Sequence, residues 1–500
     1  METCRTNSGS PSCAVLSRSS RPIWTISICS RLRMDAKSGA SSESISGKGM
    51  QGHKKRLQTV DYTDGPILGH LLKSCPAIFL GIVFQSLCLV VDTYCVSYFS
   101  AQDVAAVSAV FTLLLLTSVF SQVFSSGGIA CLAPIIGSKD KAGFLKAAAD
   151  ALNFSLIIMV AYLVLIALCS GTYLKAIATD SHVDALSKQY LLFFLPALVL
   201  PLPIAAMSAF FRASGMLSAP VGALLVMIVI NIVLAPCLTF GWLISYPLGV
   251  VGTAIASSVS NIVGLAILFA LYVRGHDSLI SLVQIPSRET VFSISRAGIP
   301  ASGEILIMFV VGAIIYSLVS PYGADAQAGL GIGSRTLQLL FWPALSAAFA
   351  TAPIIGQNHG IKHKENILKS INYGIIITSI LMCIGMILII FLGYMFINAI
   401  SADENIEKYA ITYMKIKCLS FVPLGISMVV SNALQALGRS GLSFGAAASQ
   451  MFLFGALLAF QSTISGLSFV SLSIVEVSSY ACQAILSLYL LCSAIRRLDY

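Results

Sequence analysis

The sequence predicts an all-α polytopic membrane protein with twelve transmembrane helices, built as two six-helix bundles related by a pseudo-two-fold axis along the membrane normal. Three observations predict this fold. Of the 500 residues, 57% are hydrophobic and only 10% are charged, whereas soluble domains carry about 25% charged residues. Twelve apolar segments are long enough to cross a bilayer, and short motifs recur in the same order in both halves.

The first 66 residues differ in character from the rest of the chain. They are rich in Ser, Gly, Lys and Arg and show no sustained hydrophobic periodicity, a composition typical of disorder. We therefore expect residues 1–66 to form a disordered cytoplasmic extension without a role in function. If translation starts at Met34 or Met50, the residues before that position are a start-site artefact.

The remaining chain is divided into segments of membrane-spanning length. A helix needs about 20 apolar residues to cross the hydrocarbon core. The predicted spans are residues 72–98, 104–134, 147–170, 187–210, 218–241, 248–273, 296–319, 326–354, 372–398, 408–434, 442–462 and 469–493. Several exceed the minimum length, so we expect tilted or bent helices.

Positive charges fall in every second loop between these spans. Lys and Arg gather in residues 137–146, 211–218, 274–296, 356–366 and 437–443, whereas the intervening loops are neutral or acidic. Cytoplasmic loops of membrane proteins carry an excess of Lys and Arg. The alternation therefore supports twelve spans, with both termini in the cytoplasm.

Short motifs show that the two halves are repeats of one another. The motif APIIG occurs at 133–137 and again at 352–356, and RASGMLS at 212–218 has a shorter counterpart, RSGLS, at 439–443. Six spans separate each pair, so the halves have the same orientation, an architecture found in transporters with a cavity between the lobes. The expected bundles are residues 67–273 and 296–500, joined by a cytoplasmic linker at 274–295.

Asp92 is the first candidate functional residue, because it places a carboxylate inside the first span. Such a carboxylate costs roughly 2.5–3.5 kcal/mol on insertion scales, and binding a proton or a cation relieves that cost. The alternative is a permanent hydrogen bond to Asn231, Tyr94 or a hydroxyl, which would only fix helix packing. The equivalent region of the second half, around Tyr316, has no acid, so packing shared by the halves does not explain Asp92.

Other polar and aromatic side chains are candidates for the cavity. Gln85 lies two turns before Asp92 on the same helix face. Glu304, four residues after the proline that opens the seventh span, either faces the cavity or is solvated at the cytoplasmic interface. Tyr94 and Tyr316 are candidates for an aromatic wall that contacts flat cations.

The composition argues against several classes of function. The six histidines lie in polar or boundary segments, and the 13 cysteines contain no CxxC pattern, so we expect neither a resident metal nor a catalytic triad. No GxxxxGK[ST] motif is present, so ATP does not drive the protein directly. The positive charge lies in the N-terminal extension and in short loops, which indicates membrane orientation rather than nucleic-acid binding.

Several stretches together resemble a known family. DGPILGHLLKSCPAIF, LVVDTYCVSYF, NIVLAP, GVVGTAIAS and APIIGQNHG, in this order, resemble the multidrug and toxic compound extrusion (MATE) family, with the bacterial DinF-like branch looking closest. The resemblance spans residues 64–495. It implies two six-helix bundles around a central cavity, and export of amphipathic, often cationic compounds in exchange for protons or sodium ions.

The resemblance also implies roles for individual residues. Asp92 matches the cation-coupling carboxylate of the first helix, and Asn231 matches its neighbour in the fifth. Many relatives carry a second aspartate four residues later, where this chain has Ala235. Glu304 lies about one turn nearer the cytoplasm than the glutamate of one branch. Arg335 resembles a common family arginine, for which we expect structural pairing.

We therefore expect a secondary active antiporter of the cell inner membrane that exports amphipathic, cationic small molecules in exchange for H⁺ or Na⁺ by alternating access. It is expected to be a monomer without a cofactor, in which Na⁺ binds at most transiently at Asp92. The alternative is a lipid-linked oligosaccharide flippase of related fold, which would need a more cationic cavity. A membrane-embedded enzyme is the remote alternative, since it needs clustered catalytic groups at one depth, and we expect no enzyme.

Overall fold

The computed structural model of the chain describes residues 60–178, 180–242, 247–275, 284–398, 403–464 and 468–498. These residues belong to one compact unit, Arg56–Tyr500. The disorder predicted for residues 1–59, and the middle of the predicted linker, lie outside the described residues.

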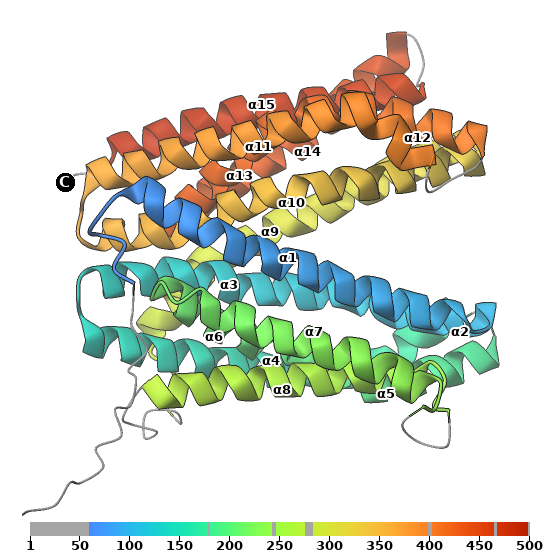
Figure 1. The fold of residues 1–500 in the computed structure, drawn as a ribbon, viewed down its shortest axis with the longest axis horizontal. Helices are drawn as coiled ribbons and strands as arrows, with labels where there is room; N and C mark the ends of the chain where they lie inside the picture. The colour runs from blue at the N-terminus through green and yellow to red at the C-terminus, as the bar shows by residue number, and fades with distance from the viewer. Residues whose placement is uncertain are drawn as a thin grey trace, which may run out of the picture. The chain divides into compact units, whose positions relative to one another are not determined.

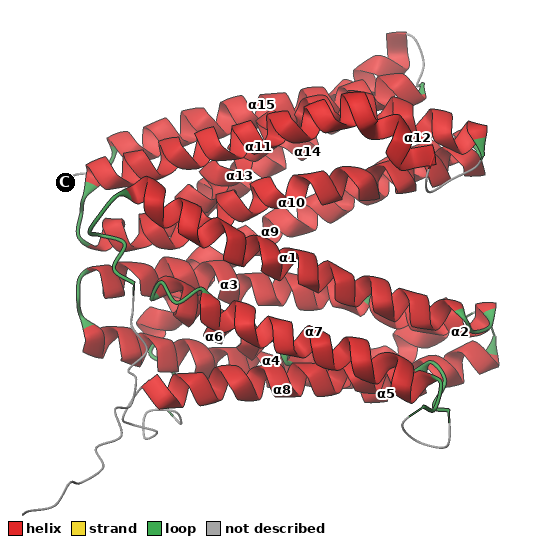
Figure 2. Cartoon of the chain, in the orientation of Figure 1, coloured by secondary structure: helices red, strands yellow, loops and turns green. Residues whose placement is uncertain are grey.

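Helices make up almost all of the described chain, and no strand occurs in it (Figures 1 and 2). The first half contains α1 (Ile67–Ser97), α2 (Ala101–Phe111), α3 (Leu113–Gly137), α4 (Lys141–Ile177), α5 (Ser181–Val199), α6 (Pro201–Ala213), α7 (Ser218–Thr239) and α8 (Val251–Gly275). The second half contains α9 (Arg288–Val319), η2 (Ser320–Tyr322), α10 (Ala324–Gly360), α11 (Lys364–Asn398), α12 (Glu404–Lys417), η3 (Cys418–Ser420), α13 (Phe421–Ala436), α14 (Ser440–Ile464) and α15 (Phe469–Arg496).

Twelve helical segments of the described chain are long and apolar enough to cross a membrane, which confirms the predicted number of spans. Three of these segments each contain two α-helices: α2 with α3, α5 with α6, and α12 with α13 through η3. A fourth segment joins α9 with η2. The α5–α6 junction has a local cause. Pro201 and Pro203 stand in the first turn of α6, where proline is tolerated because the first helical N–H groups have no intrahelical partner.

Each half has a hydrophobic core of its own, and a third core is shared. Phe124 and Phe194 belong to a core built from the first half together with Ile294 at the start of α9, whereas Met382 and Phe454 belong to a core of second-half residues alone. The shared core contains Leu132, Phe211, Ile355 and Leu434, from α3, α6, α10 and α13. The halves are thus joined through the ends of these four helices, at the left of Figure 1, and the ribbons diverge toward α2 and α12.

The repeated APIIG motifs meet at this joined end. A Cβ atom at Gly137 of α3 would lie 2.1 Å from the backbone oxygen of Gln357 in α10, and one at Gly356 would lie 2.6 Å from Cβ of Ala133. Only glycine permits such close approach of two helices, a common device in membrane interfaces. The motif that marks the sequence repeat therefore also forms one of the contacts between the two halves.

The segment just before α1 is packed, so the N-terminal extension ends earlier than residue 66. Tyr62 is only 2% exposed and lies in one hydrophobic cluster with Ile67, Leu71, Ala350 and Ile354. Composition favours disorder across this stretch, but burial of one aromatic side chain between the halves outweighs the cost of ordering a few residues.

Candidate functional site

Asp92 lies in a buried chain of three polar side chains from three helices of the first half. Its side chain, on α1, is 8% exposed. Ser257 of α8 donates its hydroxyl to Oδ2 of Asp92 at 3.2 Å, and Nδ2 of Asn231 in α7 donates to Oγ of Ser257 at 3.0 Å. The structure thus brings together Asp92 and Asn231, which the family resemblance implies to be neighbours, and places Ser257 between them.

Two oxygen atoms of these three side chains have no hydrogen-bond partner among the described residues: Oδ1 of Asp92 and Oδ1 of Asn231. The ion pairs found in the described part of the chain do not include Asp92. A buried carboxylate without a positive partner is costly. Carboxylate and amide oxygens are also the ligand types that hard cations prefer. The arrangement can therefore accept either a proton or a small cation.

Ser257 is the member of this site that sequence reasoning missed. It lies in GVVGTAIASSVS, a run of small residues in the sixth span. Small polar residues are frequent where membrane helices touch, so the run marks a helix contact. The run does not indicate which of its hydroxyls points toward Asp92.

The other candidates on α1 lie in different surroundings. Gln85 is exposed, whereas Asp92 is buried. Tyr94 is 59% exposed, and its hydroxyl lies 2.5 Å from that of Tyr98, whose ring packs edge-on against Phe240. Tyr94 therefore belongs to an aromatic group near the C-terminal end of α1.

Glu304 belongs to a polar network of the second half. Ser431 of α13 donates its hydroxyl to Oε2 of Glu304 at 2.5 Å, and Nε2 of Gln435 lies 3.4 Å from Oε1. Ser443 of α14 in turn donates to Oγ of Ser431 at 2.5 Å. Glu304 is half-buried, and it orients the side chain of Gln435, which lines a cavity.

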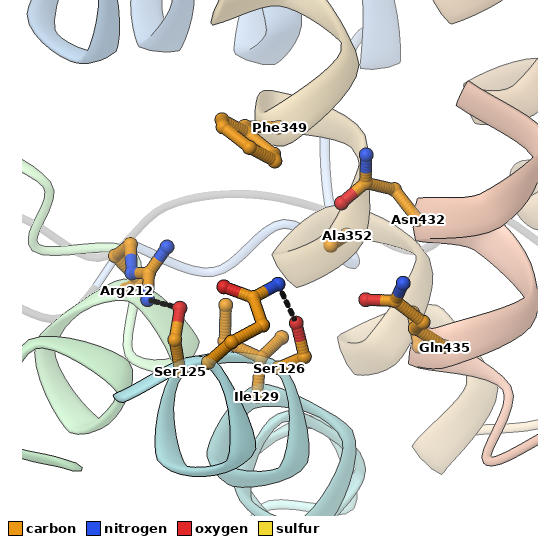
Figure 3. A pocket seen from close by; sticks show the side chains of 10 residues that line it. Ser125, Ser126, Ile129, Arg212, Phe349, Ala352, Asn432 and Gln435 are labelled. Atoms are coloured by element: carbon orange, nitrogen blue, oxygen red, sulfur yellow. Dashed lines mark hydrogen bonds between the residues drawn. The ribbon is translucent and has the colours of Figure 1, made fainter. Parts of the chain in front are cut away.

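That cavity lies between the two halves and has a volume of about 120 Å³. Its polar wall is formed by Gln122, Ser125, Ser126, Arg212, Asn432 and Gln435 (Figure 3). These side chains come from α3, α6 and α13, and α10 completes the lining. Because α3 matches α10, and α6 matches α13, in the sequence repeat, the cavity lies where the pseudo-two-fold axis passes between the halves.

Arg212 gives this cavity its charge, although from the sequence it was predicted only to be one of the loop cations that set topology. Its Nη2 donates to Oγ of Ser125 at 2.7 Å, as Figure 3 shows, and its Nε donates to the backbone oxygen of Ser208 at 3.4 Å. Within the described residues, no carboxylate oxygen lies within ion-pair distance of its guanidinium group.

Tyr316 and Arg335 remain candidates without a site. Tyr316 is 52% exposed, and its backbone oxygen accepts a hydrogen bond from Gln327 at 3.4 Å. Arg335 is exposed on α10, and none of the ion pairs in the described ranges includes it. The pairing role expected for Arg335 stays a prediction.

A buried ion pair in the second half was not expected from the sequence. Lys417 at the end of α12 and Glu476 of α15 form a salt bridge, with side chains 12% and 5% exposed. The ammonium group of Lys417 also lies 4.2 Å from the ring centre of Tyr480. The signal was present in the sequence, because isolated charges of opposite sign within two spans are expected to find one another.

Two bundles of six spans, with polar side chains buried inside one half and along the axis between the halves, define a membrane transporter rather than an enzyme. The MatE family model matches residues 77–237 and 300–461. The chain therefore belongs to the MatE family, and each half carries one copy of the family's unit. This confirms the internal repeat and the family resemblance.

Individual relatives are distant but cover most of the chain. The "Probable multidrug resistance protein YoeA" of Bacillus subtilis is 24% identical over 72% of this chain and 79% of its own length. The multidrug export protein MepA of Staphylococcus aureus is 22% identical over 77% of this chain and 85% of its own.

Solved structures share the fold. A MATE transporter described as being in the straight conformation superposes with a TM-score of 0.82 at 21% identity, covering 89% of this chain and 100% of that chain. An outward-facing multidrug resistance MATE family transporter of the MOP superfamily gives 0.81 at 20% identity, covering 89% and 99%.

Proposed function

We propose that this protein is a secondary active antiporter of the cell inner membrane, which exports amphipathic, cationic small molecules in exchange for H⁺ or Na⁺. Its distant relatives are named as multidrug resistance and export proteins, which supports this substrate class over the flippase alternative. The termini are proposed to be cytoplasmic.

The observation that carries the proposal is the environment of Asp92. Its carboxylate is buried, has one oxygen without a partner among the described residues, and is not neutralised by a basic side chain there. A buried carboxylate with a purely structural role would have both oxygens hydrogen-bonded. A group that binds and releases a cation needs a free oxygen in at least one state of the cycle.

The joined ends of the two halves bear on which conformational state of the transport cycle the structure represents. The loops at this end carry Lys139, Lys141, Lys362 and Arg439, and basic loops lie on the cytoplasmic side. The halves share a core at this end and have separate cores elsewhere. We therefore propose that the structure represents a state closed toward the cytoplasm, and that the opposite state requires separation of α3 from α10.

Coupling follows from differential affinity of the two states. A cation on Asp92 favours one arrangement of the halves and the exported compound favours the other. Each ligand shifts the equilibrium only by the ratio of its affinities for the two states. Movement of one ligand down its gradient then drives the other up its own.

The test is dye transport in inside-out membrane vesicles under imposed proton or sodium gradients. The wild type, Asp92→Asn and a control, Asp64→Asn, are compared; Asp64 is exposed outside the spans. We expect the wild type and the control to accumulate ethidium when a gradient is applied. The rate of accumulation with Asp92→Asn should be at least about ten-fold lower. Normal coupling in Asp92→Asn overturns the role of Asp92, and failure of every dye in a broad panel overturns the multidrug substrate class.

A further inference from the structure

We propose that the cavity between the halves binds a small carboxylic acid that carries a hydrogen-bond donor at its other end, a hydroxy acid or an amino acid. The proposal goes beyond the antiport function and does not depend on which ion drives transport. Three observations carry it: the charge on one wall, the acceptors on the opposite wall, and the size of the space between them.

The first-half wall presents a guanidinium group without a negative partner. Arginine has five N–H donors, and Arg212 uses two of them, on Ser125 and on the backbone oxygen of Ser208. The carboxylates of the described residues lie beyond ion-pair distance of it. Arg212 is half-buried. Charges withdrawn from water are usually paired, and the fork of the guanidinium group matches a carboxylate in two-point contact. This wall therefore favours the carboxylate end of a ligand.

The hydroxyl of Ser125 strengthens the same preference. Its oxygen accepts from Arg212 at 2.7 Å, so its own proton is free to be donated elsewhere. A hydroxyl polarised by a cation is a good donor to an anion. Ser125 and Arg212 come from α3 and α6 of the same half, so both move together when the halves separate.

The second-half wall presents acceptors. Nε2 of Gln435 donates to Ser431 and to the carboxylate of Glu304, and Nδ2 of Asn432 donates to the backbone oxygen of Met428. These contacts fix the orientation of both amides. Their side-chain oxygens lie on the side that faces Arg212 in Figure 3. Two amide oxygens repel a second anionic group and accept a hydroxyl or an ammonium.

The space between the walls limits the size of the ligand. The volume of the cavity is about 120 Å³. Sites for drug-sized molecules measure about 300–1,000 Å³. The cavity in this state therefore favours a compact acid with a three-carbon skeleton over the larger compounds proposed for export.

The test is calorimetric binding to the purified full-length chain, with four probes that share this skeleton. L-lactate and L-alanine carry both the carboxylate and the donor, propionate lacks the donor, and lactamide lacks the charge. Titrations are made at constant ionic strength in chloride. We expect saturable binding of lactate, of alanine, or of both, with propionate and lactamide at least about ten-fold weaker.

Four variants locate the binding. Arg212→Gln is expected to abolish the preference for lactate over lactamide, and Asn432→Leu to abolish the preference for lactate over propionate. Ala352→Met puts a longer side chain into the cavity and removes none of its polar groups, so it is expected to abolish binding of every probe. Arg335→Gln, which changes an exposed arginine outside the cavity, is the matched control and should bind like the wild type.

Each outcome decides the question. The proposal is wrong if neither lactate nor alanine shows saturable binding to the wild type, or if lactamide binds as well as lactate. Arg212 would then have only the structural role of holding α6 against α3. Unchanged binding in Ala352→Met places the site elsewhere and overturns it as well. Should Arg212→Gln fail to fold, the other variants still give the answer. Because no step measures transport, failure here leaves the antiport proposal standing.

Discussion

The backbone N–H of Tyr62 donates to Oε1 of Gln357 at 2.8 Å, across 295 residues of sequence. The same amide side chain uses its Nε2 to donate to the backbone oxygen of Ala213 at 2.7 Å. Gln357 is 2% exposed and belongs to the second half, whereas both of its partners belong to the first. One buried side chain thus holds the segment before α1 and the end of α6 against α10.

Substitution of Gln357 by leucine should weaken this joint. It leaves two buried backbone groups of the first half without a partner, each costing about 1–3 kcal/mol. We expect a lower thermal unfolding midpoint for Gln357→Leu than for the wild type, measured by intrinsic fluorescence of the purified protein. Gln338→Leu changes an exposed glutamine of the same helix and should leave the midpoint almost unchanged. Equal midpoints for the two variants would contradict the role of Gln357.

A single methyl group at the crossing of α3 and α10 should disturb closure of the halves. A Cβ atom at Gly137 would lie 2.1 Å from the backbone oxygen of Gln357, and a backbone oxygen cannot move aside without moving its helix. We expect Gly137→Ala to unfold at a lower temperature and to transport dye more slowly. Gly171→Ala is the control, because a Cβ atom there meets nothing within 4 Å. Wild-type behaviour of Gly137→Ala would mean that the contact is not needed.

Removal of one partner of the buried pair Lys417–Glu476 should destabilise the second half strongly. Glu476→Gln leaves an ammonium group without its anion in a site where both side chains are nearly inaccessible, which costs about 3–5 kcal/mol. The double variant Lys417→Met with Glu476→Leu removes both charges and should recover most of the lost stability. The measurement is the thermal unfolding midpoint of the single and double variants. A double variant no more stable than Glu476→Gln would indicate that the charges do more than neutralise each other.

Loss of the Ser257 hydroxyl should impair coupling without abolishing it. Ser257 donates to Asp92 at 3.2 Å, and a hydrogen bond to a charged group is worth about 1.5–3 kcal/mol. We expect gradient-driven efflux in Ser257→Ala to fall about ten-fold, less than in Asp92→Asn. Ser258→Ala removes the neighbouring hydroxyl, which donates to the backbone oxygen of Phe193 instead, and should retain full coupling. Equal efflux in the two serine variants would remove Ser257 from the site.

Local patterns in the sequence were sufficient for the architecture. The twelve spans follow from apolar length, and the repeat follows from motifs such as APIIG, which the family match to each half confirms. Asp92 and Glu304 were visible as candidates because a carboxylate within a span is rare. The end of the N-terminal extension was placed a few residues too late, since composition does not show that Tyr62 is buried between the halves.

The sequence by itself determined the class of protein, the number of spans, the two-fold repeat and the carboxylate at Asp92, because hydrophobic length and motif spacing are properties of the chain alone. Only the tertiary structure decided the partners: Ser257 for Asp92, Glu476 for Lys417, and Arg212 opposite Gln435. The physical reason is that the rotation of each helix about its own axis cannot be read from the sequence. A span that is apolar on nearly all sides has no amphipathic face to show which residues point inward, so the orientation of each helix about its axis is set by packing against its neighbours.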